Sequence, residues 1–151
     1  MTADASLTIR PIVASDASQW RALWQAYLAF YDTVLPENTY QETFRRILAA
    51  DAGMYGFLAL TGDTALGLVH YLNHQNFWKP GQTCYLQDLF TTPLARGKGV
   101  ARALMEAVFA AAAKNGIPDV YWLTAETNYA GRALYDKVGI KTPFVVYERT
   151  S

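Results

Sequence analysis

Hydrophobic positions along the chain change their spacing from one segment to the next, and this change predicts the order of strands and helices. Alternating apolar residues, and short runs rich in aromatic and β-branched residues, are typical of strands, whereas spacing of three or four residues is typical of helices. We therefore expect an α/β protein. The expected strands lie at residues 7–11, 55–60, 65–72, 84–91, 119–125 and 144–148, and the expected helices at 17–31, 41–50, 100–114 and 128–138.

The first helix carries an unusually aromatic stripe. Ser15 or Asp16 stands where a helix cap is expected, because short polar side chains satisfy the free N–H groups of a first turn. An aromatic stripe usually belongs to the core, but rings at the end of a helix can also form the wall of a substrate pocket. The stripe consists of Trp20, Leu23, Trp24, Tyr27, Leu28 and Tyr31.

A linker at residues 32–38 contains Pro36 and separates the first helix from the second. Asp32 and Glu37 lie in this linker. They are interpreted as solvated surface charges, with recognition of a cationic amine as the alternative.

The turn at residues 61–64 predicts a hairpin between the strands on either side of it. His70 and His74 follow, with His74 expected in a loop bordering the substrate channel. Four residues along a strand do not place two side chains side by side as on a helix, and no third ligand accompanies them. No metal site is expected.

The most informative stretch is a strand, a Gly-rich turn and a helix in immediate succession. Its turn, residues 96–101, reads Arg-Gly-Lys-Gly-Val-Ala. Two glycines let the backbone curl so that N–H groups of the first helical turn converge, and these groups with the helix dipole attract an anion. Arg96 and Lys98 add positive charge. The stretch is consistent with a pyrophosphate site, although a lone Gly-x-Gly also occurs in ordinary strand-to-helix turns.

Two common phosphate-binding motifs do not fit this turn. A Walker loop needs Ser or Thr directly after Gly-Lys, whereas Lys98 is followed by Gly99. A dinucleotide fingerprint needs a third Gly or Ala three positions after the second Gly, and Arg102 occupies that place. A nucleotide-binding oxidoreductase is disfavoured for this reason, and because repeated parallel βαβ units do not precede the turn.

The turn does match the pattern Gln/Arg-x-x-Gly-x-Gly/Ala, and here the chain resembles the GNAT superfamily of N-acetyltransferases, closest to its histone and polyamine acetyltransferase branch. The resemblance implies one mixed, mostly antiparallel sheet flanked by helices. It also implies that acetyl-coenzyme A binds where the fourth and fifth strands diverge, with the pantetheine arm held by the strand at residues 85–90. The implied cofactor-binding residues are Leu89, Phe90, Thr91, Arg96, Gly97, Lys98, Gly99, Val100, Ala101, Arg102, Asn128 and Tyr135.

A second resemblance lies in the segment from Asn128 to Gly139, where GNAT enzymes carry an Asn and then a Tyr just before a helix-ending Gly. It implies that Asn128 contacts the pantetheine or acyl group and that Tyr135 stands near the thioester sulfur. Seven helical residues put the two on nearly the same face, about 10 Å apart. A Tyr with an ordinary pKa of about 10 stays protonated at neutral pH and can act as general acid.

The general base is left open. Polyamine acetyltransferases commonly carry Glu at the place of Gln87, and an amide cannot act as a base at neutral pH. Asp88, Glu126, His70 or a water chain could serve instead. The resemblance also implies a backbone N–H of Leu89 or Phe90 as the donor to the oxyanion.

Length and composition limit the remaining possibilities. The 151 residues suit a single domain over 1–151, and the formal net charge of zero argues against a nucleic-acid partner. No apolar run spans a membrane, and residues 1–6 lack signal-peptide features. A lone Cys84 excludes an intramolecular disulfide and is expected to be a buried apolar residue rather than a nucleophile. A cytoplasmic location is expected.

Taken together, these observations predict an acetyl-coenzyme A-dependent N-acetyltransferase without a metal. The acceptor is expected to be a primary amine of a polyamine-like or amino-acid-like small molecule, or a lysine side chain. A non-catalytic acyl-coenzyme A sensor would keep residues 96–101 but could dispense with Tyr135, and remains the alternative. Members of the superfamily are often homodimers, and the apolar residues 144–147 form either an interface or a buried strand.

Overall fold

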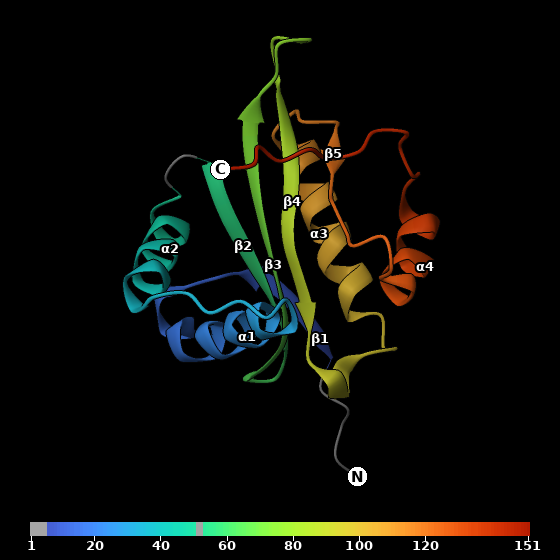
Figure 1. Cartoon of the computed structure of the whole chain (residues 1–151). Coiled ribbons are helices and arrows are strands. Elements are labelled where there is room, and N and C mark those ends of the chain that lie inside the picture. The colour runs from blue at the N-terminus through green and yellow to red at the C-terminus, as the bar shows by residue number, and fades with distance from the viewer. Residues whose placement is uncertain (1–5, 51–52) are drawn as a thin grey trace.

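The computed structural model describes residues 6–50 and 53–151, and within them five strands form one sheet in the order β1-β2-β3-β4-β5 (Figure 1). Residues 1–5, part of the segment that lacks signal-peptide features, lie outside the described residues, as do 51 and 52. Neighbouring strands are antiparallel except β4 and β5, which are parallel. The strands are Leu7–Pro11 (β1), Met54–Thr61 (β2), Thr64–Gln75 (β3), Gln82–Thr91 (β4) and Val120–Tyr121 (β5).

Helices cover both faces of this sheet. The helices α1 and α2 lie on one face, and α3 and α4 lie on the other (Figure 1). The expected α/β domain with a mixed, mostly antiparallel sheet is therefore confirmed. The described helices are Ala17–Phe30 (α1), Glu37–Ala49 (α2), Val100–Lys114 (α3) and Tyr129–Val138 (α4), with short 3-10 turns at Ala14–Asp16 (η1) and Pro93–Ala95 (η3).

Each face has its own hydrophobic core, because successive residues of a strand point to opposite sides. On the α3 side, Leu104, Met105 and Val108 are fully buried against β3 and β4. Cys84 is also fully buried, as expected, and burial raises the pKa of its thiol to about 11. The core under α1 and α2 consists of Ile12, Trp20, Leu23, Trp24, Tyr40, Ile47, Leu58, Leu60, Ala65 and Leu68.

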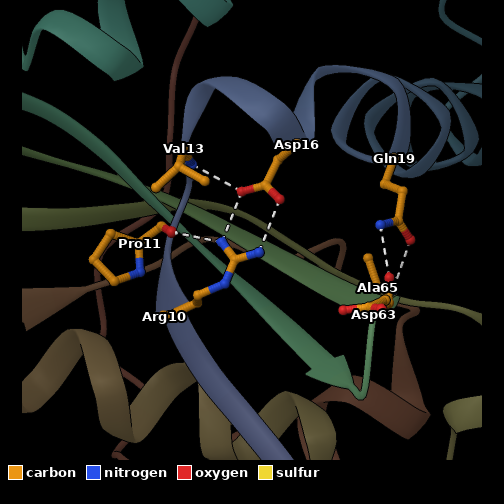
Figure 2. A network of polar contacts seen from close by, with 7 residues as sticks. All are labelled: Arg10, Pro11, Val13, Asp16, Gln19, Asp63 and Ala65. Atoms are coloured by element: carbon orange, nitrogen blue, oxygen red, sulfur yellow. Dashed lines mark hydrogen bonds and ion pairs between the residues drawn. The ribbon is translucent and has the colours of Figure 1, made fainter.

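The start of α1 is fixed to the sheet by a polar network rather than by a side-chain cap (Figure 2). The Asp16 carboxylate accepts two hydrogen bonds from the Arg10 guanidinium, at 2.7 and 2.9 Å, and a third from the Val13 backbone N–H at 2.8 Å. One turn later, Gln19 pairs with the β2–β3 turn through the Asp63 carbonyl and the Ala65 N–H. Asp16 thus precedes the helix as predicted, but it links the helix start to β1.

Several predicted boundaries were wrong. α2 begins at Glu37, directly after Pro36, because proline lacks an N–H and fixes φ near the helical value, which suits the entry to a helix where no intrahelical donor is needed. β3 continues to Gln75, so His74 is a strand residue and not a loop residue. β5 has only the two residues Val120 and Tyr121, because its pairing with β4 ends there.

The last predicted strand, residues 144–148, was also wrong, since the structure has no strand there. Its apolar side chains are exposed: Phe144 by 81%, Val145 by 75%, Val146 by 66% and Tyr147 by 90%. A strand needs a neighbour to accept and donate its backbone hydrogen bonds. Among the described residues this segment has none, and local strand propensity alone does not supply one.

None of the described helices combines the length and apolar character that crossing a membrane would require.

Candidate active site

The fourth and fifth strands separate along the sheet, and this separation creates an opening. β4 pairs with β5 only at Cys84 and Tyr85, opposite Val120 and Tyr121. Immediately afterwards, the β3–β4 register shifts by one residue, leaving Gln87 as the extra residue of a β-bulge. A bulge bends its strand and increases the local twist. The divergence expected between the fourth and fifth strands is therefore present.

Backbone groups of β4 beyond the bulge are available on the side away from β3. The Thr92 N–H donates to the Leu66 carbonyl at 2.8 Å. Alternate residues of an antiparallel strand bond the same neighbour, so Phe90 also directs its backbone groups toward β3. Leu89 and Thr91 then direct theirs toward the opening. Of the two residues considered as oxyanion donors, this alternation favours Leu89.

The N-terminus of α3 has the geometry expected for anion binding. Gly97 and Gly99 have φ angles of 76° and 79°, the left-handed region that favours glycine. Ala103 donates its N–H to the Gly99 carbonyl. For the residues between Arg96 and Ala103, no backbone N–H of the described chain donates to a carbonyl. The N–H groups of residues 97–102, here called the phosphate cradle, are thus left for a ligand.

The space in front of the phosphate cradle is open. A Cβ atom built on Gly97 or Gly99 would meet nothing within 4 Å. Side chains around it differ in what they can offer. Val100 is buried in the core and contributes only its backbone, while Arg102 forms an ion pair with Glu106 at 3.1 Å. Acetyl-coenzyme A, a pyrophosphate ligand, fits unpaired N–H groups beside an open space.

Tyr135 faces the opening between β4 and β5. Its ring packs edge-on against Trp122, with 5.8 Å between ring centroids. Burial, followed by the nearby Tyr31, raises the pKa of the Tyr135 hydroxyl, so it remains a proton donor at neutral pH. The opening, here called the β4–β5 opening, is lined by Tyr27, Tyr31, Leu86, Gln87, Leu89, Trp122, Leu123, Thr124 and Tyr135.

Asn128 lies at the N-cap of α4, and both ends of its side chain are engaged. Its amide nitrogen donates to the Thr124 hydroxyl at 2.9 Å, and its oxygen accepts from the Gly131 N–H at 3.2 Å. A Cβ at position 131 would lie 2.4 Å from the Asn128 nitrogen, so the glycine makes room for the cap. Asn128 therefore fixes the start of the helix that carries Tyr135, and its contact with a ligand stays a prediction.

The candidate bases lie in different surroundings. His70 and Asp88 are opposite each other on β3 and β4, are 8% and 9% exposed, and are joined by a 2.8 Å contact between His70 Nδ1 and Asp88 Oδ2. Glu126 is exposed in the turn before α4. His74 is engaged with the Tyr121 hydroxyl at 2.9 Å and the Gln75 carbonyl at 2.8 Å.

Trp20 and Trp24 contribute polar contacts that the sequence pattern did not reveal. Their indole N–H groups donate to His70 Nε2 at 2.9 Å and to Asp88 Oδ2 at 3.2 Å. The i, i+4 spacing predicts a shared helix face, but it gives no sign that the two N–H groups serve a histidine and a carboxylate.

The two acidic residues predicted to lie in the linker, Asp32 and Glu37, are not equivalent, and Glu37 is the first residue of α2. Glu37 forms a two-pronged ion pair with Arg21, and the Arg21 guanidinium lies 4.5 Å from the centroid of the Tyr40 ring. Glu37 is thus occupied by a cation of the chain itself, whereas Asp32 is exposed at a left-handed backbone position. Within residues 6–50 and 53–151, no three His, Cys, Asp or Glu side chains gather as metal ligands would.

Comparisons with known proteins agree with this geometry. The sequence profile described as "Acetyltransferase (GNAT) family" matches residues 20–140. The D-amino-acid N-acetyltransferase HPA3 of Saccharomyces cerevisiae is 39% identical over 146 residues, covering 95% of this chain and 90% of that protein. A thialysine N-epsilon-acetyltransferase of Caenorhabditis elegans is 31% identical over 85 residues, covering 56% of this chain and 52% of that protein.

The fold also matches solved structures. The aminoglycoside N-acetyltransferase AAC(6')-Iy in complex with CoA superimposes with a TM-score of 0.86 at 20% identity, covering 99% of this chain and 98% of that one. At this level of identity the match concerns the fold.

Proposed function

The chain belongs to the GNAT acetyltransferase family and is an N-acetyltransferase, and we propose that it transfers the acetyl group of acetyl-coenzyme A to the primary amine of an amino-acid-like small molecule. One observation carries the proposal. The phosphate cradle and the β4–β5 opening are joined by β4 and the short η3 turn, so one extended ligand can reach both.

The residues that would hold acetyl-coenzyme A follow from this arrangement. The N–H groups of residues 97–102 would bind its pyrophosphate, with Arg96 and Lys98 adding positive charge. The Leu89 carbonyl and the outward backbone groups of Thr91 would bind the pantetheine arm as a neighbouring strand would. The AAC(6')-Iy structure with CoA, which has the same fold, supports this co-substrate.

Within the opening, the chain supplies two groups for the chemistry. Bound acetyl-coenzyme A would supply an activated acetyl thioester. The Leu89 N–H would donate to the carbonyl oxygen as negative charge develops on it. The Tyr135 hydroxyl would give its proton to the sulfur as the carbon–sulfur bond breaks. Because the pKa of Tyr135 is raised, the hydroxyl is still protonated when the thioester bond breaks.

The acceptor class is inferred from the relatives and from the walls of the opening. HPA3 is named for D-amino acids and the nematode relative for thialysine, and both are amino acids. Tyr27 and Tyr31 form an aromatic side of the opening, suited to an apolar side chain or to a cation. Polyamines and protein lysine side chains are the competing acceptors.

The test is release of thiol from acetyl-coenzyme A across D- and L-amino acids, thialysine, polyamines, aminoglycosides and lysine-containing peptides. Turnover is expected with amino acids. Cofactor binding should be followed in parallel as a thermal shift, because a ligand that binds the folded state raises its stability. Binding without turnover by any amine would favour a non-catalytic acyl-coenzyme A sensor instead. Absence of binding would refute the proposal that the phosphate cradle binds acetyl-coenzyme A.

We further propose that the chain works as a homodimer in the cytoplasm, over a single domain of residues 1–151. Exposed apolar residues in the C-terminal segment support the dimer, because association would remove their side chains from water. The lone Cys84 supports a compartment in which disulfides are not formed.

A further inference from the structure

The lining of the β4–β5 opening carries no charged side chain. The nine residues of this lining comprise four aromatic residues, three leucines, Gln87 and Thr124. A tyrosine hydroxyl has an ordinary pKa of about 10 and is neutral at neutral pH, and burial raises the pKa of Tyr135 further. Removing a charge from water without a partner is costly. A polycationic acceptor would therefore leave its additional ammonium groups without a counter-charge in this lining.

Acidic side chains of the elements around the opening do not supply that counter-charge. Asp88 is 9% exposed, lies outside the lining, and accepts hydrogen bonds from inside the protein, including one from the Tyr27 hydroxyl. Glu37 is already held in an ion pair within the chain. Asp32 and Glu126 are exposed, and neither belongs to the lining. A second ammonium of the acceptor thus finds no free carboxylate at the opening.

One ammonium does suit the opening. Tyr27 lies on α1 and Tyr31 at its end, on the face of the sheet opposite to α3 and the phosphate cradle (Figure 1). With the cofactor held from the α3 side, the acceptor approaches along these two rings, whose faces attract a cation. An α-amino acid with an uncharged side chain brings one ammonium and, on the same carbon, a carboxylate that balances its charge. Polyamines, aminoglycosides and lysine bring at least one ammonium more.

Gln87 offers the hydrogen bonds that a carboxylate needs. It is the extra residue of the β-bulge in β4, is exposed, and lies in the lining of the opening. Within the described part of the chain, no group is hydrogen-bonded to its side-chain amide. An uncharged amide can donate two N–H bonds, and hydrogen bonds to a charged partner are stronger than those between neutral groups. A carboxylate at Gln87 thus gains a hydrogen bond, while its charge stays balanced by the ammonium of the acceptor itself.

Resting on the acetyltransferase function proposed above, we propose that the acceptor is an α-amino acid with an uncharged side chain, acetylated on its α-nitrogen, and that Gln87 determines this specificity by binding the carboxylate of the acceptor. The Gln87 amide N–H donates to a carboxylate oxygen and so orients the neighbouring α-nitrogen toward the thioester. The nitrogen loses two protons and forms one bond to the carbonyl carbon, whose bond to sulfur breaks. One proton ends on the thiol, through Tyr135, and the other in water. The carboxylate takes no part in the bond changes.

The first test uses four acceptors that differ by one charged group at a time. Pentylamine is norleucine without its carboxylate, lysine is norleucine with a second ammonium, and cadaverine is lysine without its carboxylate. We expect kcat/KM, measured as thiol release, to be about 10-fold or more higher for norleucine than for pentylamine, as loss of a hydrogen bond to a charged group predicts. It should exceed the value for lysine by a similar factor. A preference for lysine or cadaverine over both enantiomers of norleucine, or equal values for norleucine and pentylamine, would overturn the proposal.

The second test changes Gln87. Gln87→Met keeps the length of the side chain without its N–H donor, so kcat/KM for norleucine should fall to about that for pentylamine, while the value for pentylamine stays unchanged. Gln87→Glu places a like charge beside the carboxylate and a counter-charge beside a second ammonium, so the preference for norleucine over cadaverine should reverse. Equal losses for all four acceptors would mean that Gln87 has a structural role and no part in specificity.

Gln25→Glu is the matched control for the added charge. Gln25 lies at an exposed position of α1 outside the lining of the opening, so the kinetics of this variant should match those of the wild type. A reversed preference in Gln25→Glu as well would mean that the net charge of the protein, and not a contact with Gln87, selects the acceptor.

Binding distinguishes failure of this specificity from failure of the proposed function. With coenzyme A bound, isothermal titration of norleucine needs no turnover, and the wild type should bind norleucine about 10-fold more tightly than Gln87→Met does. If the wild type acetylates no amine but shows this difference, the proposed function fails and the carboxylate site stands. If amines are acetylated and the two proteins bind norleucine equally, Gln87 does not bind the acceptor.

Discussion

The assigned role of Tyr135 can be tested by removing one oxygen atom. Tyr135→Phe keeps the ring that packs against Trp122 and removes only the proton donor. Turnover should fall by about 100-fold, in the range typical of general acids, while acetyl-coenzyme A affinity stays the same. Steady-state kinetics and cofactor titration separate the two effects. Tyr129→Phe is the matched control, because Tyr129 lies on the same helix and is 74% exposed. Unchanged turnover of Tyr135→Phe would remove Tyr135 from the mechanism.

The Arg10–Asp16 pair should contribute a pH-dependent part of the stability. The Arg10 guanidinium, through its hydrogen bonds, holds the pKa of Asp16 below its usual value. A carboxyl whose pKa is lowered in the folded state stabilises the fold at pH values above its unfolded pKa of about 3.9. This contribution is lost as the pH falls through the pKa of the folded state. Asp16→Asn should therefore lower the free energy of unfolding by about 1–3 kcal/mol at neutral pH, and progressively less below pH about 4.

Urea denaturation at several pH values measures this difference. Glu42→Gln is the comparison, since it breaks an exposed ion pair with Arg45, and exposed pairs contribute little. An Asp16→Asn effect that stays constant down to the acid limit would show that packing, rather than charge, accounts for it.

At the scale of elements, the turn before α3 should control cofactor binding. Gly99 has a left-handed backbone and an open space where a side chain would point. Gly99→Val strains this backbone and fills the space in front of the phosphate cradle. Acetyl-coenzyme A should bind about 100-fold more weakly, as expected if two charge-assisted hydrogen bonds are lost. Isothermal titration measures the change.

Gly62→Val provides the matched control for this substitution. Gly62 also has a left-handed φ angle, of 59°, with nothing within 4 Å of a built Cβ, but it lies in the β2–β3 turn. Gly62→Val should lower the melting temperature without weakening the binding of acetyl-coenzyme A. Equal losses of affinity in the two variants would mean that backbone strain, and not the cradle, is responsible.

The elements that the sequence predicts well are those with local signals. The glycines before α3 and at its end, and the turn between the apolar runs of β2 and β3, act within a few positions. The structure has these elements at the expected places, with β3 extended to Gln75. β5 and the C-terminal segment depend on which strand edge is free to pair, and that is a property of distant residues. The polar role of Trp20 and Trp24 was missed because an aromatic stripe is counted as apolar.

At the scale of the whole molecule, the C-terminal segment exposes a run of apolar side chains to solvent. α4 has no buried residue, and the segment after it exposes Ile140 by 92% in addition to the apolar residues 144–147. The hydrophobic effect favours removing such surface from water, and a second copy of the chain presents the same surface in the complementary orientation. Association through this segment would also bring the second copy near the helix that carries Tyr135.

Val146→Asp should therefore dissociate the proposed homodimer, because an unpaired carboxylate in an apolar interface is not solvated. Size-exclusion chromatography with light scattering, at micromolar concentration, gives the mass directly. Phe77→Ser is the control, since Phe77 is also exposed but lies in the β3–β4 connection. A dimer that survives Val146→Asp and is lost in Phe77→Ser would place the interface at the β3–β4 connection. A wild-type monomer would refute the dimer, and the C-terminal segment would then be free to pair with another protein.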